Sequence, residues 1–309
     1  MRGPGPLCET GLVMAGTPRT PSTAGRPVAA GEVVERTETL LPGPARALGA
    51  LLDVPVPDLE NGAGLPLLWH WVYLLERPAQ ADLGPDGHPV RGTIPAPPEP
   101  GRRRMWAGGR VSASGPLRCG EQATRRSRVQ SVEDKQGRSG PLTFCVVHHQ
   151  VSQRGRVVID ERQDIVYRAA VSPAGPPAAG WEGTDVPPAE GERAIEVSPT
   201  LLFRFSALTY NAHRIHYDRD YARGVEGYPG LLTHGPLQAL AMTEAARAID
   251  AGDRPDDAGL SFEYKLISPL FDFQGLVAGA SAGPDVITTG VRDLHGRPTA
   301  TGTLRVGAG

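Results

Sequence analysis

The chain has 309 residues, of which 39% are hydrophobic and 21% charged, and its net charge is −2. The absence of a basic excess argues against bulk attraction to nucleic acid or to an anionic membrane, and no apolar run reaches the length of a membrane span. The three cysteines, Cys8, Cys119 and Cys145, show no C-x-x-C spacing, which is typical of a protein of the reducing cytoplasm. We therefore expect a cytoplasmic protein that binds neither nucleic acid nor membrane.

Glycine and proline divide the chain into segments. They are dense at the N-terminus, around 85–101 and around 173–188, and such stretches are typical of tails and linkers. We expect a disordered tail over residues 1–30, a folded domain over 31–172, a linker over 173–192 and a second folded domain over 193–309.

The first domain is predicted to begin with helices and to end in strands. Pro44 lies near the first turn of a helix predicted over 44–52, and residues 65–75 are apolar nearly all round, which favours a helix buried in a core. A loop rich in proline and glycine follows over 84–101. Residues with high strand propensity then predict strands over 104–113, 122–133, 141–152 and 156–168, with a hairpin turn at 152–155.

The second domain repeats this order. A short helix is predicted over 199–207, and a longer one over 235–250 has its apolar residues on one side. Strands are predicted over 259–267, 274–282, 284–293 and 297–306. The matching order indicates two copies of one α+β unit, in which an antiparallel sheet wraps around a central helix.

The segment Tyr210–Asp218 (YNAHRIHYD) carries the strongest candidates for chemistry. Histidine titrates near neutral pH, so His216 could take a proton from water and return it. Five residues earlier, the amide of Asn211 could hold the same water. Alternatively, both residues only cap turns, as asparagine often does. The polar residues crowded around them weaken this alternative, and the segment alone leaves both interpretations open.

A metal site would have to include His213 and His216. A catalytic zinc site needs a third protein ligand, and neither an H-E-x-x-H motif nor a cysteine pair supplies one. His148 and His149 are adjacent in a predicted strand, so they point to opposite faces and make a poor chelate. We expect no metal ion.

His234 and Gly235 stand at the predicted start of the helix over 235–250. The first backbone N–H groups of a helix lack partners within it, so the Gly235 amide could bind a thioester carbonyl oxygen with help from the helix dipole. Glycine would also let a substrate approach the backbone closely. The alternative is an ordinary helix start.

Two groups of arginines are candidates for phosphate binding. They are Arg102–Arg104 and the set Arg125, Arg126 and Arg128. Arginine suits the phosphates of coenzyme A, and the alternative is a solvated charge run on an edge strand. The P-loop, Rossmann and nucleophile-elbow motifs are absent from the sequence, which argues against nucleotide hydrolysis, Rossmann redox chemistry and α/β-hydrolase chemistry.

Residues 211–222 resemble the signature of MaoC-type dehydratases, D-x-N-P-[LIV]-H followed by five residues and an alanine. By position, Asn211 takes the place of the acidic residue, His216 takes the place of the catalytic histidine, and Ala222 closes the motif. The pair at 234–235 matches the family's His-Gly before the central helix, where the glycine amide is the oxyanion donor.

Three residues depart from that signature, because Asn211 replaces the acid, His213 the asparagine and Arg214 the proline. These replacements resemble one subgroup, that of hydroxyacyl-thioester dehydratase type 2 and mesaconyl-C4-CoA hydratase. The N-terminal half is similar to the same subgroup over residues 65–71, 86–89, 103–109 and 164–168. The resemblance runs from about residue 31 to residue 306.

The resemblance implies a double hotdog fold of the α+β class, in which each antiparallel sheet is wrapped around a central α-helix. It implies an N-terminal hotdog without catalytic residues, which binds coenzyme A and shapes the substrate tunnel, and a catalytic C-terminal hotdog. The implied partner is an acyl thioester of coenzyme A or of acyl carrier protein, and no cofactor is needed. Two such chains could form a homodimer.

The implied reaction is the reversible hydration of a 2-enoyl thioester to a 3-hydroxyacyl thioester. Its implied catalytic residues are His216 as the base, Asn211 as the holder of the water and Gly235 as the oxyanion donor. A dicarboxylic substrate such as mesaconyl-CoA would need a cation, for which Arg104 is the first candidate and Arg214 the second. The expected substrate-binding residues are Arg103, Arg104, Trp106, Tyr210, His213, Arg214, His234 and Thr243.

Two other functions compete with this one. A hotdog thioesterase would release free acid and thiol instead of adding water. A degenerate acyl-thioester-binding protein would bind substrate without turnover, and the loss of the acid at position 211 favours that interpretation.

Overall fold

The computed structural model describes residues 32–95, 102–137, 140–169, 183–249 and 259–307. The tail predicted over 1–30 and half of the linker predicted over 173–192, residues 173–182, lie outside these residues. In the described half, residues 183–191 contain no helix or strand, and Glu192 begins a strand. None of the described helices is both long and apolar enough to cross a membrane.

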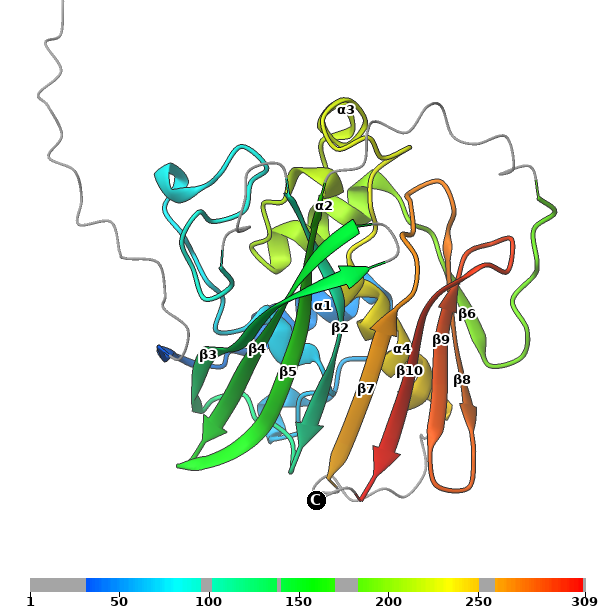
Figure 1. Cartoon of the computed structure of the whole chain (residues 1–309). Coiled ribbons are helices and arrows are strands. Elements are labelled where there is room, and N and C mark those ends of the chain that lie inside the picture. The colour runs from blue at the N-terminus through cyan, green and yellow to red at the C-terminus, as the bar shows by residue number, and fades with distance from the viewer. Residues whose placement is uncertain (1–31, 96–101, 138–139, 170–182, 250–258, 308–309) are drawn as a thin grey trace, which may run out of the picture.

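Ten strands of the described chain form one antiparallel sheet. The N-terminal half contributes the order β1-β3-β4-β5-β2 and the C-terminal half the order β7-β10-β9-β8-β6. The halves join where β2 pairs with β7, so the strands run side by side across the molecule (Figure 1). The strands are β1 (Val34–Thr39), β2 (Arg102–Ala113), β3 (Gln122–Gly137), β4 (Gly140–Gln153), β5 (Arg156–Ala169), β6 (Glu192–Ile195), β7 (Leu260–Leu266), β8 (Leu276–Ala282), β9 (Ile287–Arg292) and β10 (Pro298–Val306).

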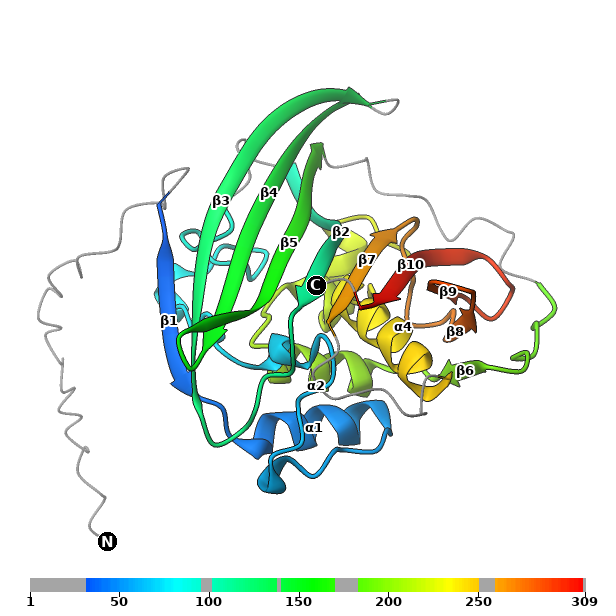
Figure 2. The same cartoon turned by 90° about the horizontal axis from the view of Figure 1, so that it is seen from below.

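Helix α4 (Gly235–Ile249) is the central helix of the C-terminal half, and it packs against β8, β9 and β10. Seen from below, it lies inside the curve of these strands, with α1 and α2 beneath (Figure 2). This half confirms the predicted α+β unit of a sheet wrapped around a helix. The other helices are α1 (Pro42–Leu52), α2 (Pro199–Leu208), α3 (Arg219–Gly224) and the 3-10 helices η1 (Leu59–Asn61), η2 (Trp69–Val72), η3 (Gln80–Asp82) and η4 (Arg214–His216).

The N-terminal half lacks the corresponding α-helix among its described residues. The prediction of a helix over 65–75 is wrong, because only η2 forms there. Leu68 and Leu74, on either side of this short turn, have positive φ values of 70° and 54°, a conformation that no right-handed helix contains. The apolar run is buried as predicted, but it crosses the core as an irregular segment.

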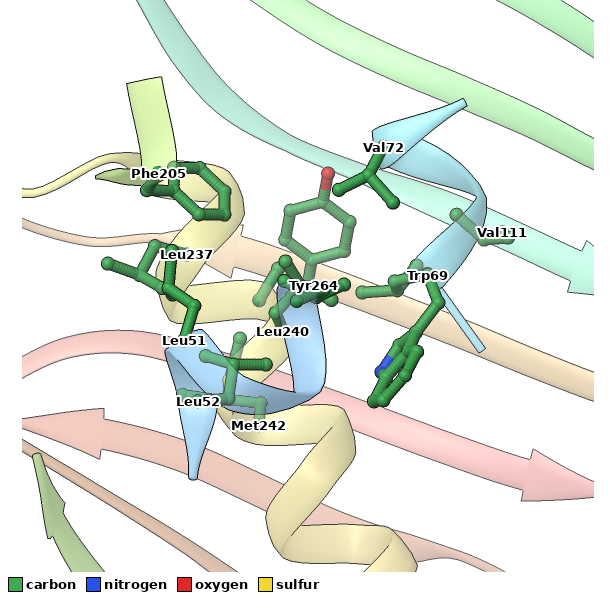
Figure 3. Close-up of a cluster of buried hydrophobic side chains, with 14 of the residues drawn as sticks. Leu51, Leu52, Trp69, Val72, Val111, Phe205, Leu237, Leu240, Met242 and Tyr264 are labelled. Atoms are coloured by element: carbon green, nitrogen blue, oxygen red, sulfur yellow. The ribbon is translucent and has the colours of Figure 1, made fainter. Parts of the chain in front are cut away.

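One hydrophobic core joins the two halves (Figure 3). Trp69 of η2 and Val111 of β2 meet Leu240 of α4 and Tyr264 of β7, and all four side chains are buried. The Trp69 Nε1–H also donates a hydrogen bond to Glu244 of α4 at 2.8 Å. Because both halves bury apolar surface in the same core, we expect them to fold as one unit.

The sequence predicts strands β2 to β5 and β7 to β10 but not the edge strands β1 and β6. β1 reads VERTET and β6 reads ERAI. Such short polar stretches have too few apolar residues for an alternating pattern to indicate a strand. Each lies at an end of the sheet, where charged side chains are tolerated because one edge faces solvent.

Candidate active site

A cavity of about 970 Å³ lies between the two halves. Trp71, His88 and Trp106 line it from the N-terminal half, and His216 and Gly235 line it from the C-terminal half. Because no described residue forms an α-helix across the N-terminal strands, side chains of β3, β4 and β5 line this space directly. Cavities of this size that are lined by two halves of a protein commonly bind small molecules.

The segment that follows α2 brings Asn211 and His216 to the cavity. Tyr210 takes a positive φ of 53°, and Asn211 Oδ1 accepts a hydrogen bond from the His213 N–H at 3.0 Å. This is a turn that asparagine commonly makes. Because Oδ1 is the acceptor in this turn, the NH₂ group of the same amide is the part left for the cavity. Asn211 therefore shapes a turn and lines the cavity at once.

The ring of His216 is held in one tautomer. Its Nδ1 lies 2.7 Å from the Leu232 carbonyl oxygen, and a carbonyl only accepts, so Nδ1 carries the hydrogen and Nε2 keeps its lone pair. Burial lowers the pKa of His216 well below 6.5, and the neighbouring His234 and His213 lower it further. At neutral pH the ring is therefore uncharged, as a general base must be.

The ring of His234 stacks on that of His216, with centroids 3.6 Å apart and an angle of 17° between the planes. His234 Nε2 lies 2.9 Å from Ser206 Oγ. Burial lowers the pKa of His234 to about 3, with a further contribution from His213. Since both stacked rings are neutral at pH 7, they contact each other without charge repulsion, and His234 supports the orientation of His216.

Helix α4 begins at Gly235 beside the cavity. Pro236 has no N–H group, so Gly235 offers the first donor of this helix. A Cβ atom at Gly235 would lie 2.3 Å from Leu266 Cδ1 and 3.4 Å from Trp106 Cβ. A side chain at this position would therefore displace the end of the Leu266 side chain. The positive end of the helix dipole favours an oxygen anion at the same place.

A loop of the N-terminal half docks onto the segment that carries Asn211 and His216. The Arg214 N–H donates to the Asp86 carbonyl at 2.9 Å. Gly87 has a φ of 88°, and a Cβ atom there would lie 1.8 Å from the Ala212 carbonyl oxygen. Only glycine fits this approach. The loop thereby places a histidine of the N-terminal half, at position 88, in the cavity.

His88 continues a row of four imidazole rings. It lies 3.9 Å from His213, which lies 5.5 Å from His216, the ring that stacks on His234. Burial lowers the pKa of His88 to about 3, and His213 adds to this effect. Its Nδ1 lies 3.0 Å from Asp86 Oδ2. Burial alone would raise the pKa of Asp86, but hydrogen bonds from His88 and its charge outweigh burial and lower it.

Asp86, His88 and His213 also form a group that could hold a metal ion, with ligand atoms within 4.8 Å of one another. The geometry favours a hydrogen-bonded cluster instead. Both carboxylate oxygens of Asp86 accept hydrogen bonds from His88, one from its backbone and one from its ring. The two imidazole rings lie against each other 3.9 Å apart, whereas metal ligands must direct their nitrogen lone pairs at one point.

Most of the predicted substrate-binding residues line the cavity, namely Arg104, Trp106, Tyr210, His213 and His234. The remaining three make other contacts. Arg103 is buried in an ion pair with Glu226 at 3.2 Å, and Arg214 binds Asp218 at 2.7 Å. Thr243 donates to the backbone of α4 at 3.0 Å. A substrate-binding role for these three stays a prediction.

Strand alternation separates the members of the second arginine group. Arg125 lines the cavity, whereas Arg126 is exposed and pairs with Glu35 at 2.8 Å. Arg128 is exposed as well. The group therefore does not present one continuous patch to a phosphate, but it does send one guanidinium into the cavity.

The family described as hydroxyacyl-thioester dehydratase type 2 has a model that matches residues 68–272 of this chain. The chain is 41% identical over 265 residues to the mesaconyl-C(4)-CoA hydratase of Chloroflexus aurantiacus. That alignment covers 85% of this chain and 91% of the relative, so it includes both halves of the sheet and the cavity between them.

Solved structures share the fold. The MaoC-like dehydratase from Phytophthora capsici is 15% identical and superposes with a TM-score of 0.62, which covers 89% of this chain and 95% of that one. A Mycobacterium tuberculosis protein described as a double hotdog is 13% identical, with a TM-score of 0.53 and coverage of 90% and 96%. These likenesses confirm the predicted double hotdog.

Proposed function

The chain belongs to the hydroxyacyl-thioester dehydratase type 2 family, and from this premise we propose that it catalyses the reversible hydration of a 2-enoyl thioester to a 3-hydroxyacyl thioester. One observation carries the proposal. His216, neutral and with its lone pair on Nε2, lines the same cavity as the first N–H of α4. A base and an oxyanion donor in one cavity are what this reaction needs.

In the hydration direction, the Gly235 N–H binds the thioester carbonyl oxygen. Nε2 of His216 takes a proton from water while the water oxygen bonds to the β-carbon. The electron pair of the carbon–carbon double bond moves onto the thioester as an enolate, whose charge the α4 dipole stabilises. The α-carbon then takes the proton back from His216, so the base is regenerated.

Asn211 holds the water in this mechanism. A side-chain amide neither ionises nor becomes protonated near neutral pH, so it cannot replace a carboxylic acid in proton transfer. Its Oδ1 is engaged by the His213 N–H, and its NH₂ group donates to the oxygen of the water and later to the product hydroxyl. His216 consequently serves both proton transfers.

We propose a coenzyme A thioester with a short dicarboxylic acyl group as the substrate. Mesaconyl-C4-CoA, from the name of the 41% identical relative, is the first candidate. Its free carboxylate needs a cation, and Arg104 lines the cavity with a buried Nε that has no hydrogen-bonding partner among the described residues. Arg104 Nη2 donates to the Pro95 carbonyl at 3.1 Å, which anchors the guanidinium.

The proposal is tested by a hydration assay over a panel of 2-enoyl-CoA thioesters, read as loss of the enoyl-thioester absorbance. We expect hydration without release of free thiol, which a thiol reagent measures in the same sample. Thiol release in step with absorbance loss would instead identify a thioesterase. Calorimetric binding of the panel without any turnover would identify a binding protein, and either result would refute the proposal.

A further inference from the structure

Arg125 on β3 lines the N-terminal end of the cavity. Its Nε is buried and has no hydrogen-bonding partner among the described residues, and burial lowers the pKa of the guanidinium. An arginine side chain carries five N–H donors and keeps its charge in proteins. Because a charged donor removed from bulk water is costly unless an acceptor meets it, this position calls for an anionic oxygen.

The carboxylates around Arg125 contact other groups, and none of them accepts a hydrogen bond from its Nε. Glu76 acts on it most strongly, but Glu76 accepts a hydrogen bond from the Thr93 N–H at 3.2 Å and lies 3.4 Å from Arg36 Nη2. Glu161 accepts hydrogen bonds from three other side chains. These acids lower the cost of the buried charge without supplying the missing acceptor.

His149 supplies a second polar group at this end of the cavity, and the neighbouring Gln163 side chain acts on its ring by hydrogen bonding, which raises its pKa against the larger effect of burial. The His149 side chain is 4% exposed and lines the same cavity, and its Nε2 is buried. Nδ1 lies 2.7 Å from Ser127 Oγ, and burial lowers the pKa of His149 to about 4, so the ring is neutral at pH 7. When the Ser127 hydroxyl donates to Nδ1, the hydrogen of the ring is on Nε2.

Both donors lie far from the reacting end of the cavity. Trp106 on β2 contacts the start of α4, whereas Arg125 lies three strands away on β3. Three strand spacings amount to about 14 Å along the sheet. Trp71 connects the two ends, since its ring lies 5.9 Å from that of Trp106 and its Nε1 donates to Glu161, the strand partner of His149.

We propose that Arg125 and His149 bind a carboxylate at the far end of an acyl group that enters the N-terminal half of the cavity. The inference rests on the proposed hydration reaction, and it extends the substrate class to acyl chains longer than the mesaconyl group. Chains that end in a methyl group would leave the Arg125 Nε unpaired, so the site discriminates against them.

The test compares pairs of 2-enoyl-CoA thioesters of equal length, from four to about twelve carbons, that end in a methyl or a carboxylate group. For the longer carboxylate-ended substrates, Arg125→Met should lower kcat/KM roughly tenfold to a hundredfold, the usual effect of losing a hydrogen bond to a charged group. Methyl-ended substrates should change by less than about threefold. Arg125→Lys should keep part of the selectivity, since it keeps the charge.

Arg162→Met is the matched control. Arg162 lies on the same sheet but is exposed and pairs with Asp164 at 2.8 Å, so neither class of substrate should be affected. Arg125→Met could instead lower kcat/KM equally for both end groups, and this loss could vanish with N-acetylcysteamine thioesters, which lack the phosphates. That result would assign Arg125 to coenzyme A binding and overturn the proposal. Unchanged selectivity would overturn it too. A wild-type protein that hydrates none of the substrates would instead refute the proposed function.

Discussion

His216 and His234 stack with their ring centroids 3.6 Å apart. The contact joins the residue before α4 to the short helix η4, so the proposed base and the proposed oxyanion donor are held as one unit. Both rings are neutral at pH 7 before reaction, because burial and neighbouring imidazoles lower their pKa values. This pair therefore sets both the geometry and the protonation state of the site.

His216→Gln should abolish most turnover. The variant keeps a side chain of similar size but has no group that can take a proton, and the loss of a general base typically costs a hundredfold or more in kcat. His148→Gln is the control. His148 does not line the cavity, and its Nε2 lies 3.0 Å from Asp160 Oδ2. A His216→Gln protein that keeps more than about a tenth of kcat would contradict the base assignment.

The pH dependence of kcat/KM should show no acid limb near pH 6.5. The neutral form of His216 is the active one in the proposed mechanism, and its pKa lies well below 6.5, so lowering the pH through 6.5 does not protonate the base.

The free energy of unfolding, in contrast, should change with pH in this range. Four histidines, His88, His149, His216 and His234, have pKa values that removal from water lowers.

Because the unfolded chain binds more protons than the folded chain below pH 6.5, the free energy of unfolding should fall as the pH falls. Initial rates and thermal melts at each pH separate the two effects. A reversible loss of activity centred near pH 6.5, in protein that melts at an unchanged temperature, would disagree with a buried neutral base.

Asn211→Asp should retain turnover and shift its pH profile, whereas Asn211→Ala should lose turnover. Aspartate can still accept the hydrogen bond from the His213 N–H, and its charge favours protonated imidazoles nearby, so the acid limb should move to higher pH. Alanine loses the turn and the donor to water, for which roughly a tenfold loss of kcat is expected. Equal kinetics for Asn211→Ala and the wild type would show that the amide does not hold the water.

The parts of the site that come from one segment could be predicted from the sequence, whereas the parts that come from distant segments could not. Asn211, His216 and Gly235 lie within one continuous stretch, so spacing and a helix start place them together. His88 and Arg125 come from distant segments of the N-terminal half. His88 reaches the cavity because its loop packs on the segment with Asn211 and His216, and Arg125 reaches it because the sheet curves.

The helix predicted over 65–75 fails for a related reason. Its apolar pattern reports burial correctly, but the chain's path is set by contacts with other segments. The Trp71 and His70 side chains bond to Glu161 on β5, and a regular helix over these residues would not direct both toward one carboxylate. Because this segment is not an α-helix, it leaves space in which an acyl group could lie. No pattern within the segment indicates that space.

Arg104→Met should raise KM for mesaconyl-CoA more than for an uncharged enoyl-CoA of the same length. The guanidinium lines the cavity and is the first candidate for the cation that binds a carboxylate on a short acyl group. An ionic hydrogen bond of this kind is worth roughly tenfold or more in affinity. Steady-state kinetics with both substrates measure the difference, and an unchanged KM for mesaconyl-CoA would remove Arg104 from the substrate contacts.

Gly87→Ala should weaken both the fold and the activity, because it separates the N-terminal loop from the segment that carries Asn211 and His216. The added methyl group would lie 1.8 Å from the Ala212 carbonyl oxygen, in a residue whose φ is 88°. The positive φ alone costs about 1–2 kcal/mol, and the clash adds about 1–3 kcal/mol.

Gly155→Ala separates these two costs. Gly155 has a φ of 75° in the hairpin between β4 and β5, and a methyl group added there would meet no described atom within 4 Å, so only the cost of the positive φ applies. Thermal melts should therefore show the larger loss for Gly87→Ala, and kcat should fall only in that variant. If both variants melt alike and keep wild-type kcat, the loop does not position Asn211 and His216.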